Sequence, residues 1–176
     1  MVKAFYLDHP EKLVTLEELE KSIGVLYTYI DHRDYEGRIQ EICEERGYAH
    51  RSMVYLFKEK TSNIDELLPK FFEEHIHEFE EIRYIVDGTG IFDVRDKNDV
   101  WIRVMVEAGD LLVLPAGIYH RFTLDEKKYA IAMRLFLKEM TAPVWTPFNR
   151  VELTVDEMPC RKNYVEKYNL TVKADV

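Results

Sequence analysis

Residues 73–84 read EEHIHEFEEIRY, and this stretch decides how the rest of the chain is interpreted. Along a β-strand successive side chains point to opposite faces, so residues separated by an even number point the same way. His75, His77 and Glu81 share that parity, and so does Arg83. On an α-helix the two histidines would lie about 200° apart and could not both face one ion. The spacing therefore predicts an extended chain that presents two histidines and a carboxylate from one face.

A third histidine closes a second stretch, residues 109–120, which read GDLLVLPAGIYH. A lone histidine is more often a surface or core residue than a ligand. His77 with Glu81 would also suit an i, i+4 pair on a helix. Metal ligands, however, come in clusters. Three imidazoles and one carboxylate suit a borderline divalent ion such as Fe, Ni, Mn, Co or Zn. The predicted ligands are His75, His77, Glu81 and His120.

The composition narrows the class of protein. The 176 residues carry a formal net charge of -9, with 33 acidic against 24 Lys and Arg residues, which does not suit a phosphate backbone. No apolar run approaches the length of a transmembrane helix, and the first residues meet acid and proline too early for a signal peptide. Only two cysteines are present, which favours a reducing compartment. We expect a single cytoplasmic domain with no nucleic-acid partner and no membrane insertion.

The N-terminal part, about residues 1–74, is predicted to be mainly helical. Thr15 and Glu18 have the spacing of a capping box, and Gly24 is a natural stop for the helix that follows. Short extended segments are expected at residues 5–7 and 25–30. Two further helices are predicted, at 38–46 with Gly47 as its stop and at 62–74, the second kinked or split by Pro69.

The part from about residue 75 to 150 is predicted to be a β-barrel core. Residues 87–90, Asp-Gly-Thr-Gly, read as a hairpin loop between the first two strands. Closely spaced strands without helices between them indicate an antiparallel sandwich or barrel. The tail, 151–176, reads as wrapping segments with a short helix near Tyr164. The six predicted strands are 82–86, 91–94, 101–106, 111–114, 121–124 and 129–136.

Two motifs resemble those of the cupin superfamily. The pattern His-x-His-x3-Glu-x6-Gly is filled by His75, His77, Glu81 and Gly88. The pattern Gly-x5-Pro-x-Gly-x2-His is filled by Gly109, Pro115, Gly117 and His120. The chain departs from the usual motifs at Pro69 and Leu124, where a Gly and an Asn would stand. The resemblance implies a mainly β protein: a cupin double-stranded β-helix, which is a jelly-roll-like antiparallel barrel, with N-terminal helices packed outside.

Within the cupins the chain is similar to the acireductone dioxygenase family of the methionine salvage pathway. The similarity extends from the N-terminal strand to about Arg150 and rests on six runs. These are FEEHIH (72–77), EEIRY (80–84), FDVRD (92–96), LPAGIYHRFTLD (114–125), MRLF (133–136) and PVWTP (143–147).

The resemblance implies an enzyme with one Fe(II) or Ni(II) per chain, held by the four predicted ligands. Its substrates would be acireductone and O2. The Fe form would give formate and the keto acid precursor of methionine, and the Ni form would give formate, carbon monoxide and methylthiopropionate. The resemblance also implies a monomer. Entry into the nucleus by diffusion is open to a chain of this size.

Two arginines are candidate catalytic residues. Arg83 has the parity of the ligands, although a surface ion pair with Glu80 or Glu81 would also explain it. Arg134 lies in an apolar strand, where a charge needs a partner or a wet cavity. The family resemblance favours a functional role for both. Ile85, Phe92 and Phe122 are candidates for the pocket that takes the methylthio tail, although aromatic residues on strands are more often plain core.

Two alternatives keep the fold but change the function. A non-catalytic cupin would bind a small molecule or a protein partner, but a binding module does not need an open metal site. A cupin with another reaction, such as an isomerase, would fit the two motifs, but it would not explain the longer runs. The spacing identifies no catalytic base, and Trp101, Trp145, Cys43 and Cys160 are assigned no catalytic role.

Overall fold

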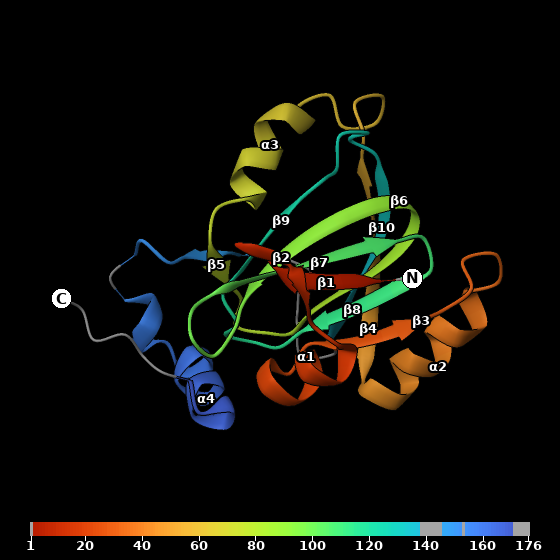
Figure 1. Cartoon of the computed structure of the whole chain (residues 1–176). Coiled ribbons are helices and arrows are strands. Elements are labelled where there is room, and N and C mark those ends of the chain that lie inside the picture. Colours follow the sequence, from red (N-terminus) through yellow and green to blue (C-terminus); the bar gives the residue numbers. More distant parts are fainter. Residues whose placement is uncertain (1, 138–145, 153, 171–176) are drawn as a thin grey trace.

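The computed structural model describes residues 2–137, 146–152 and 154–170. It shows a mainly β, antiparallel architecture with helices on the outside, as the sequence predicted (Figure 1). Helices α1 (Leu16–Ile23) and α2 (Glu36–Arg46) lie together on one side of the strands, and α3 (Ile64–Phe71) lies at the opposite end. Among the described residues, no helix has both the length and the apolar character needed to cross a membrane.

Both predicted ends of α1 and the predicted C-terminal end of α2 are confirmed, whereas α2 begins at Glu36 and not at Arg38. The Thr15 backbone N–H donates to Glu18 Oε2 at 2.7 Å and the Glu18 N–H donates to Thr15 Oγ1 at 3.1 Å, which forms the capping box. Gly24 and Gly47 end α1 and α2 with left-handed φ angles of 74° and 75°. The third helix is shorter than predicted and is not split. Pro69 lies in its last turn, which ends before His75.

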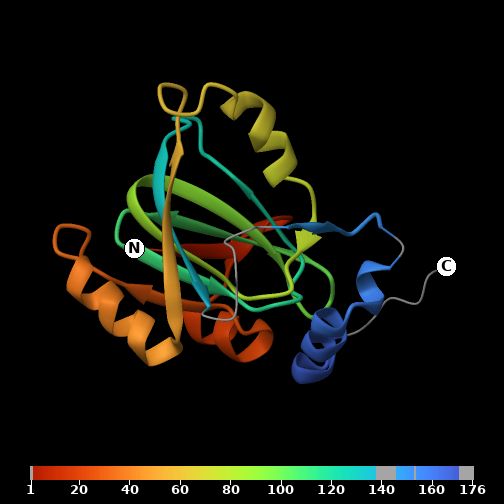
Figure 2. The ribbon, with the colours of Figure 1, turned by 180° about the vertical axis from the view of Figure 1, so that it is seen from behind.

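Strand β6 (Glu81–Arg95) belongs to both sheets of the barrel. One sheet has the order β3-β8-β6-β10-β4, and the other has the order β11-β5-β9-β6-β7-β1-β2. Figure 2, which shows the molecule from behind, shows β4 and β10 side by side in front of the other strands. The remaining strands are β1 (Lys3–Tyr6), β2 (His9–Leu13), β3 (Leu26–Tyr29), β4 (Tyr48–Leu56), β5 (His75–Ile76), β7 (Trp101–Glu107), β8 (Asp110–Leu114), β9 (His120–Thr123), β10 (Ala130–Leu137) and β11 (Phe148–Asn149).

The predicted hairpin at residues 87–90 is wrong. The chain continues through these residues as one 15-residue strand, and Gly88 pairs with Ala130 while Thr89 pairs with Glu107. Gly88 has a φ angle of 79°, and a Cβ atom there would lie 2.3 Å from the backbone oxygen of Tyr129. Only glycine fits this position without strain. The glycine therefore marks a bend from one sheet into the other and not a reversal of the chain.

The N-terminal part contains more strand than predicted. Besides its three helices it supplies β1 to β4, and the nine-residue β4 pairs along the length of β10. The sequence of β4, YAHRSMVYL, has polar residues on both faces, so it lacks the alternation that identifies a half-buried strand. In the tail, the predicted short helix near Tyr164 is present as α4 (Pro159–Tyr168), preceded by a short helical turn, Val155–Glu157.

The first half of β6 shows the alternation of faces on which the sequence argument rests. Ile82 and Tyr84 pack outward into the hydrophobic cluster that contains Ile39 of α2. Arg83 and Ile85 instead line an internal cavity. The parity of residues 81–85 therefore separates the side chains that bind a covering helix from those that face the interior.

Candidate metal centre

The sheet pairing brings the four predicted ligands together. His75 on β5 lies opposite His120 on β9, and Glu81 begins β6. One potential ligand atom from each of His75, His77, Glu81 and His120 lies within 4.8 Å of the others, and all four residues are buried. The expectation of a single extended chain is only partly right, because a bend at Glu78 and Phe79 separates β5 from β6.

A backbone carbonyl oxygen fixes each of the three imidazole rings. The Nδ1 atoms of His75, His77 and His120 lie 2.6, 2.9 and 2.9 Å from the carbonyl oxygens of Glu73, Thr146 and Ile118. A carbonyl oxygen can only accept, so each Nδ1 must carry the proton and donate. In a neutral imidazole this leaves the Nε2 lone pair available to a metal, which is the arrangement that outer hydrogen bonds impose on metal-binding histidines.

Glu81 accepts contacts on both of its oxygens. Oε2 lies 3.0 Å from Nε2 of His120 and 3.4 Å from Nε2 of His77. Oε1 forms an ion pair with Arg83 at 3.0 Å. Two unprotonated Nε2 atoms and an ionised carboxylate oxygen all have lone pairs directed into the same space. A divalent cation between them would turn mutual repulsion into coordination, so this donor set fits a borderline metal ion.

The electrostatics of the site agree with those protonation states. Burial, followed by the charge of neighbouring His120, lowers the pKa of His75 to about 3. Burial acts to raise the pKa of Glu81, but the charge of Arg83, followed by the close contacts with His120 and His77, outweighs it and holds the pKa well below its usual value. At neutral pH His75 is therefore neutral and Glu81 is ionised, which is the state that binds a metal.

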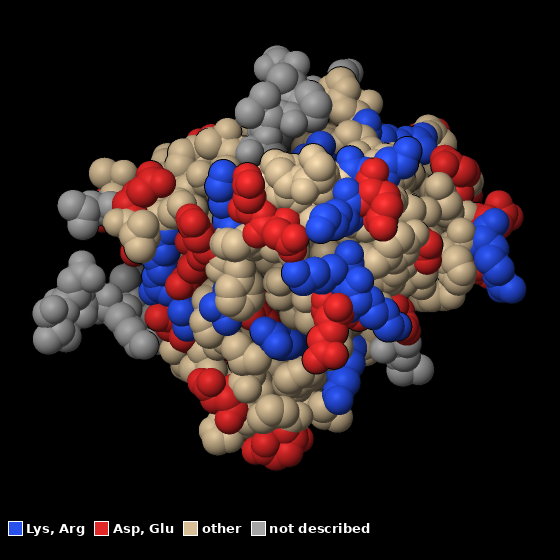
Figure 3. Space-filling view, turned by 90° about the horizontal axis from the view of Figure 1, so that it is seen from above, with Lys and Arg blue, Asp and Glu red and all other residues tan. Residues whose placement is uncertain are grey.

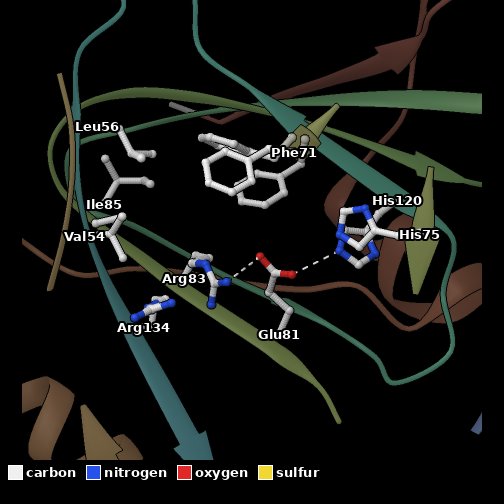
Figure 4. Close-up of a pocket in the computed structure, with 12 residues that line it drawn as sticks. Val54, Leu56, Phe71, His75, Glu81, Arg83, Ile85, His120 and Arg134 are labelled. Atoms are coloured by element: carbon white, nitrogen blue, oxygen red, sulfur yellow. Dashed lines mark hydrogen bonds and ion pairs between the residues drawn. The ribbon is translucent and has the colours of Figure 1, made fainter. Parts of the chain in front are cut away.

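Next to the ligands lies a cavity of about 110 Å³. Figure 4 shows His75 and His120 at one end and Val54, Leu56 and Ile85 at the other. Glu81 and the two arginines lie along one wall, and aromatic rings that include Phe71 lie along the other. The complete lining is Val54, Leu56, Phe71, His75, Glu81, Arg83, Ile85, Phe92, His120, Phe122, Ala132 and Arg134.

Arg83 and Arg134 are neighbours across β6 and β10, where they pair in register. Arg83 does form an ion pair with Glu81, one of the two partners considered. The pair is not at the surface, however, because only 13% of the Arg83 side chain is exposed. Arg134 donates from Nε to Ser52 Oγ at 2.9 Å. Burial lowers the pKa of Arg134, and burial opposed by Glu81 lowers that of Arg83 to about 10, so both remain cations at neutral pH.

All three predicted pocket residues, Ile85, Phe92 and Phe122, line the cavity, and the rings of Phe92 and Phe122 lie 4.9 Å apart. The contribution of β4, which supplies Val54 and Leu56, does not follow from the sequence, because this strand lacks a clear alternation of polar and apolar residues. Phe71 also lines the cavity, and its position directly before the run FEEHIH is the signal that could have identified it. Trp145, interpreted as a packing residue, lies outside the described residues.

Comparisons with known proteins agree with this site. A chicken (Gallus gallus) protein named acireductone dioxygenase is 46% identical over 180 residues, covering 94% of this chain and 96% of that protein. Acireductone dioxygenase 4 from Arabidopsis thaliana is 49% identical over 172 residues, covering 94% and 88%. The relatives therefore match this chain over nearly its whole length.

A solved structure shows the same fold. The acireductone dioxygenase from Bacillus anthracis, described with a cadmium ion in its active centre, superimposes with a TM-score of 0.73 at 27% sequence identity. The alignment covers 84% of this chain and 98% of that one, which confirms the expected cupin fold. A sequence model described as the ARD/ARD′ family matches residues 6–147, a range that includes both histidine motifs. The buried three-histidine, one-carboxylate cluster thus lies where the family similarity is continuous, and the chain belongs to the ARD/ARD′ family of acireductone dioxygenases.

Proposed function

We propose that this protein is a metal-dependent dioxygenase that cleaves acireductone with O2, and that His75, His77, Glu81 and His120 hold one Fe(II) or Ni(II). One observation carries the proposal: three histidines, each fixed through Nδ1 by a carbonyl oxygen, gather around one ionised carboxylate. The names of the chicken and Arabidopsis relatives support acireductone as the substrate. The bound ion would supply a Lewis acid that favours the ionised form of the enediol.

The wall of two arginines suits an anionic substrate. Arg83 and Arg134 are adjacent cations, and Glu81 is the one carboxylate among the cavity-lining residues that the structure describes. The cavity wall is therefore positively charged beyond what Glu81 neutralises. A fixed cation beside the ionised enediol lowers the free energy of the anion and needs no reorganisation when the substrate enters. We propose that both arginines act in this way, with Arg83 also orienting Glu81.

The opposite part of the cavity suits the apolar tail of acireductone. Ile85, Phe92 and Phe122 present carbon surfaces, and Val54 and Leu56 close the end that is farthest from the histidines (Figure 4). A thioether is soft and polarisable and makes favourable contacts with aromatic rings. We propose that the methylthio group lies among these side chains, so that the reacting oxygens face the ligands.

We further propose that the metal selects the products: formate and the keto acid precursor of methionine from the Fe form, and formate, carbon monoxide and methylthiopropionate from the Ni form. The match of residues 6–147 to the ARD/ARD′ family supports this choice. The cavity residues are the same in both cases, so the difference must come from the ion. With these products the protein would act in methionine salvage.

We also propose a domain organisation and a cellular location. The chain forms one domain over residues 1–176, with a core at about 75–150 and a wrapping tail at 151–176. It acts as a monomer in the cytoplasm and enters the nucleus by diffusion. Cys43 and Cys160 are both free thiols, which suits a reducing compartment. Figure 3 shows Lys and Arg interspersed with Asp and Glu on the face it presents, which does not suit a nucleic-acid backbone.

Product analysis tests the proposal. Metal-free protein is reloaded anaerobically with Fe(II) or Ni(II), given acireductone and exposed to O2. We expect formate with the keto acid from the first and carbon monoxide from the second. Metal uptake without consumption of acireductone would keep the site but assign the chain another reaction. Failure to bind either ion would leave the non-catalytic binding protein as the better interpretation.

A further inference from the structure

The short segment from Thr146 to Arg150, here called the strap, runs along β5, the strand that carries His75 and directly precedes His77. The carbonyl oxygen of Thr146 accepts from His77 Nδ1 at 2.9 Å. Strand β11 pairs with β5 so that Asn149 lies opposite His75. The Arg150 backbone N–H donates to the carbonyl oxygen of Glu74 at 2.9 Å. The strap therefore contacts His75 through the pairing of β11 with β5 and His77 through its ring.

The side chain of Arg150 locks the strap in place. Its Nη1 donates to Glu74 Oε1 and to Asp99 Oδ1, both at 2.7 Å, and its Nη2 donates to Asp99 Oδ2 at 3.1 Å. Arg95 donates from Nε to the same Glu74 oxygen at 2.9 Å and from Nη1 to the Asp99 carbonyl oxygen at 2.7 Å. Two guanidinium groups thus share two acidic residues, and one of these, Glu74, immediately precedes a ligand.

Asp99 is held in the orientation that this arrangement needs. It lies in the turn between β6 and β7 with a φ angle of 62°, a left-handed conformation that few residues other than glycine adopt. The side chain of Asp96 fixes the same turn by accepting from the backbone N–H groups of Asn98 and Val100, both at 2.8 Å. The carboxylate therefore meets Arg150 in a fixed direction, and forming the pair orders little additional chain.

Arg150 also reaches the third histidine through its neighbour. Tyr119, directly before His120, is fully buried, and the guanidinium carbon of Arg150 lies 4.5 Å from the centre of its ring. Arg161 of α4 lies 4.3 Å from the same ring, and Asp156 accepts from the Tyr119 hydroxyl at 2.7 Å. Arg150 therefore contacts the residue before His75 and the residue before His120. It is not among the residues that line the cavity.

We propose that Arg150 is a positioning residue that, with Glu74 and Asp99, holds the strap against β5 and so determines how long the site retains its metal ion. This inference rests on the proposed metal site. It assigns a role to a residue beyond the region of the family match, which ends at residue 147. Loss of an outer contact that orients ligands typically weakens metal binding about 10-fold or more. We expect the weaker binding to appear as a faster dissociation of the metal.

The test compares the rate at which Ni(II) leaves the loaded protein for an excess of a chromogenic chelator, well below the melting temperature. Arg150→Met should release the ion about 10-fold faster than the wild type. Arg150→Lys supplies a single point charge in place of a planar guanidinium group. Its release rate should therefore lie between those of the wild type and Arg150→Met. Thr15→Ala is the matched control, because it removes a helix cap at a cost of about 1 kcal/mol and Thr15 is neither a ligand nor a cavity residue. It should release Ni(II) at the wild-type rate.

The outcomes separate this inference from the proposed function. Equal release rates for Arg150→Met and a wild type that retains Ni(II) would overturn the inference alone. Faster release from Thr15→Ala as well would assign Arg150 a general structural role and would also overturn it. A wild type that binds no metal would overturn the proposed function and the inference together. If Arg150→Met does not fold, Asp99→Asn weakens the same ion pair with Arg150 in place and should also accelerate release.

Discussion

Nε2 of His120 lies 3.0 Å from Oε2 of Glu81, and both atoms carry lone pairs when Nδ1 of the histidine donates to the Ile118 carbonyl oxygen. A divalent ion that joins these two atoms binds the folded chain but not the unfolded one. At a free concentration of about 100 times its Kd, Ni(II) should therefore raise the free energy of unfolding by about 2.7 kcal/mol. Thermal unfolding with and without a chelator measures the shift. A His120→Ala protein with the same shift would show that the ion binds elsewhere.

Replacing a predicted ligand should remove the metal and leave the fold. His75→Ala deletes one of four donors and lies on a strand of only two residues, so we expect metal content and dioxygenase activity to fall to background while the far-ultraviolet circular dichroism stays unchanged. His32→Ala is the matched control, because His32 is exposed and lies outside the cluster. Full activity in His75→Ala would show that the ligand assignment is wrong.

The two arginines should separate in their effect on metal binding. Arg134 binds Ser52, so Arg134→Met should lower kcat/KM about 10- to 100-fold, the value of one charged hydrogen bond, with metal content unchanged. Arg83 binds Glu81, so Arg83→Met should lower both kcat/KM and the affinity for the metal. Steady-state kinetics and metal analysis of the same preparations provide the comparison. Identical behaviour of the two variants would contradict separate roles.

Asp93 should be the most costly carboxylate to remove outside the site. It is fully buried on β6, and its oxygens accept from Arg103 Nε at 2.8 Å and from Arg121 Nε at 2.9 Å. Asp93→Asn leaves both guanidinium groups without a counter-charge, so urea unfolding should show a loss of about 3 kcal/mol. Asp65→Ala, which breaks an exposed pair with Lys128, should cost less than about 1 kcal/mol. Equal losses of unfolding free energy in the two variants would show that burial does not determine the cost of removing these carboxylates.

Two glycines should respond to alanine with opposite signs. At Gly88 the new Cβ would lie 2.3 Å from the Tyr129 oxygen in a left-handed conformation, so the variant should lose at least about 1–2 kcal/mol. Gly37 lies in α2, and a Cβ there meets nothing within 4 Å. Gly37→Ala should therefore gain about 0.5–1 kcal/mol, because alanine favours the helix. Urea unfolding measures the free energy of unfolding of both variants. A Gly88→Ala protein that is more stable than the wild type would disprove the bend in β6.

The sequence predicted what depends on short-range pattern and missed what depends on distant pairing. Parity along residues 81–85 correctly separated Arg83 and Ile85 from Ile82 and Tyr84. The local chemistry of Asp-Gly-Thr-Gly is the same for a turn and for a bend in a strand, so the hairpin was wrong. Strand β4 owes its structure to its pairing with β10 and shows no periodicity of its own. Its contribution to the cavity therefore stayed invisible.

The site shows the same division. The four donors could be selected because histidines at strand spacing are rare and chemically specific. Nothing in the spacing of Arg150 connects it with Glu74, which lies 76 positions earlier and meets it only in the folded chain. Contacts of this kind follow from the three-dimensional arrangement and from no local signal.

The bend in β6 also has a consequence for how this enzyme family can diversify. One strand supplies Glu81 and Arg83 to the cavity before Gly88 and supplies Phe92 after it. An insertion of one residue just after the bend would turn the second half of the strand over and exchange Phe92 for a neighbour, while the first half keeps its pairing with β8 and β10. If the proposed roles hold, the residues at the metal and the residue beside the substrate tail therefore lie on separately mutable portions of a single strand, joined at a glycine.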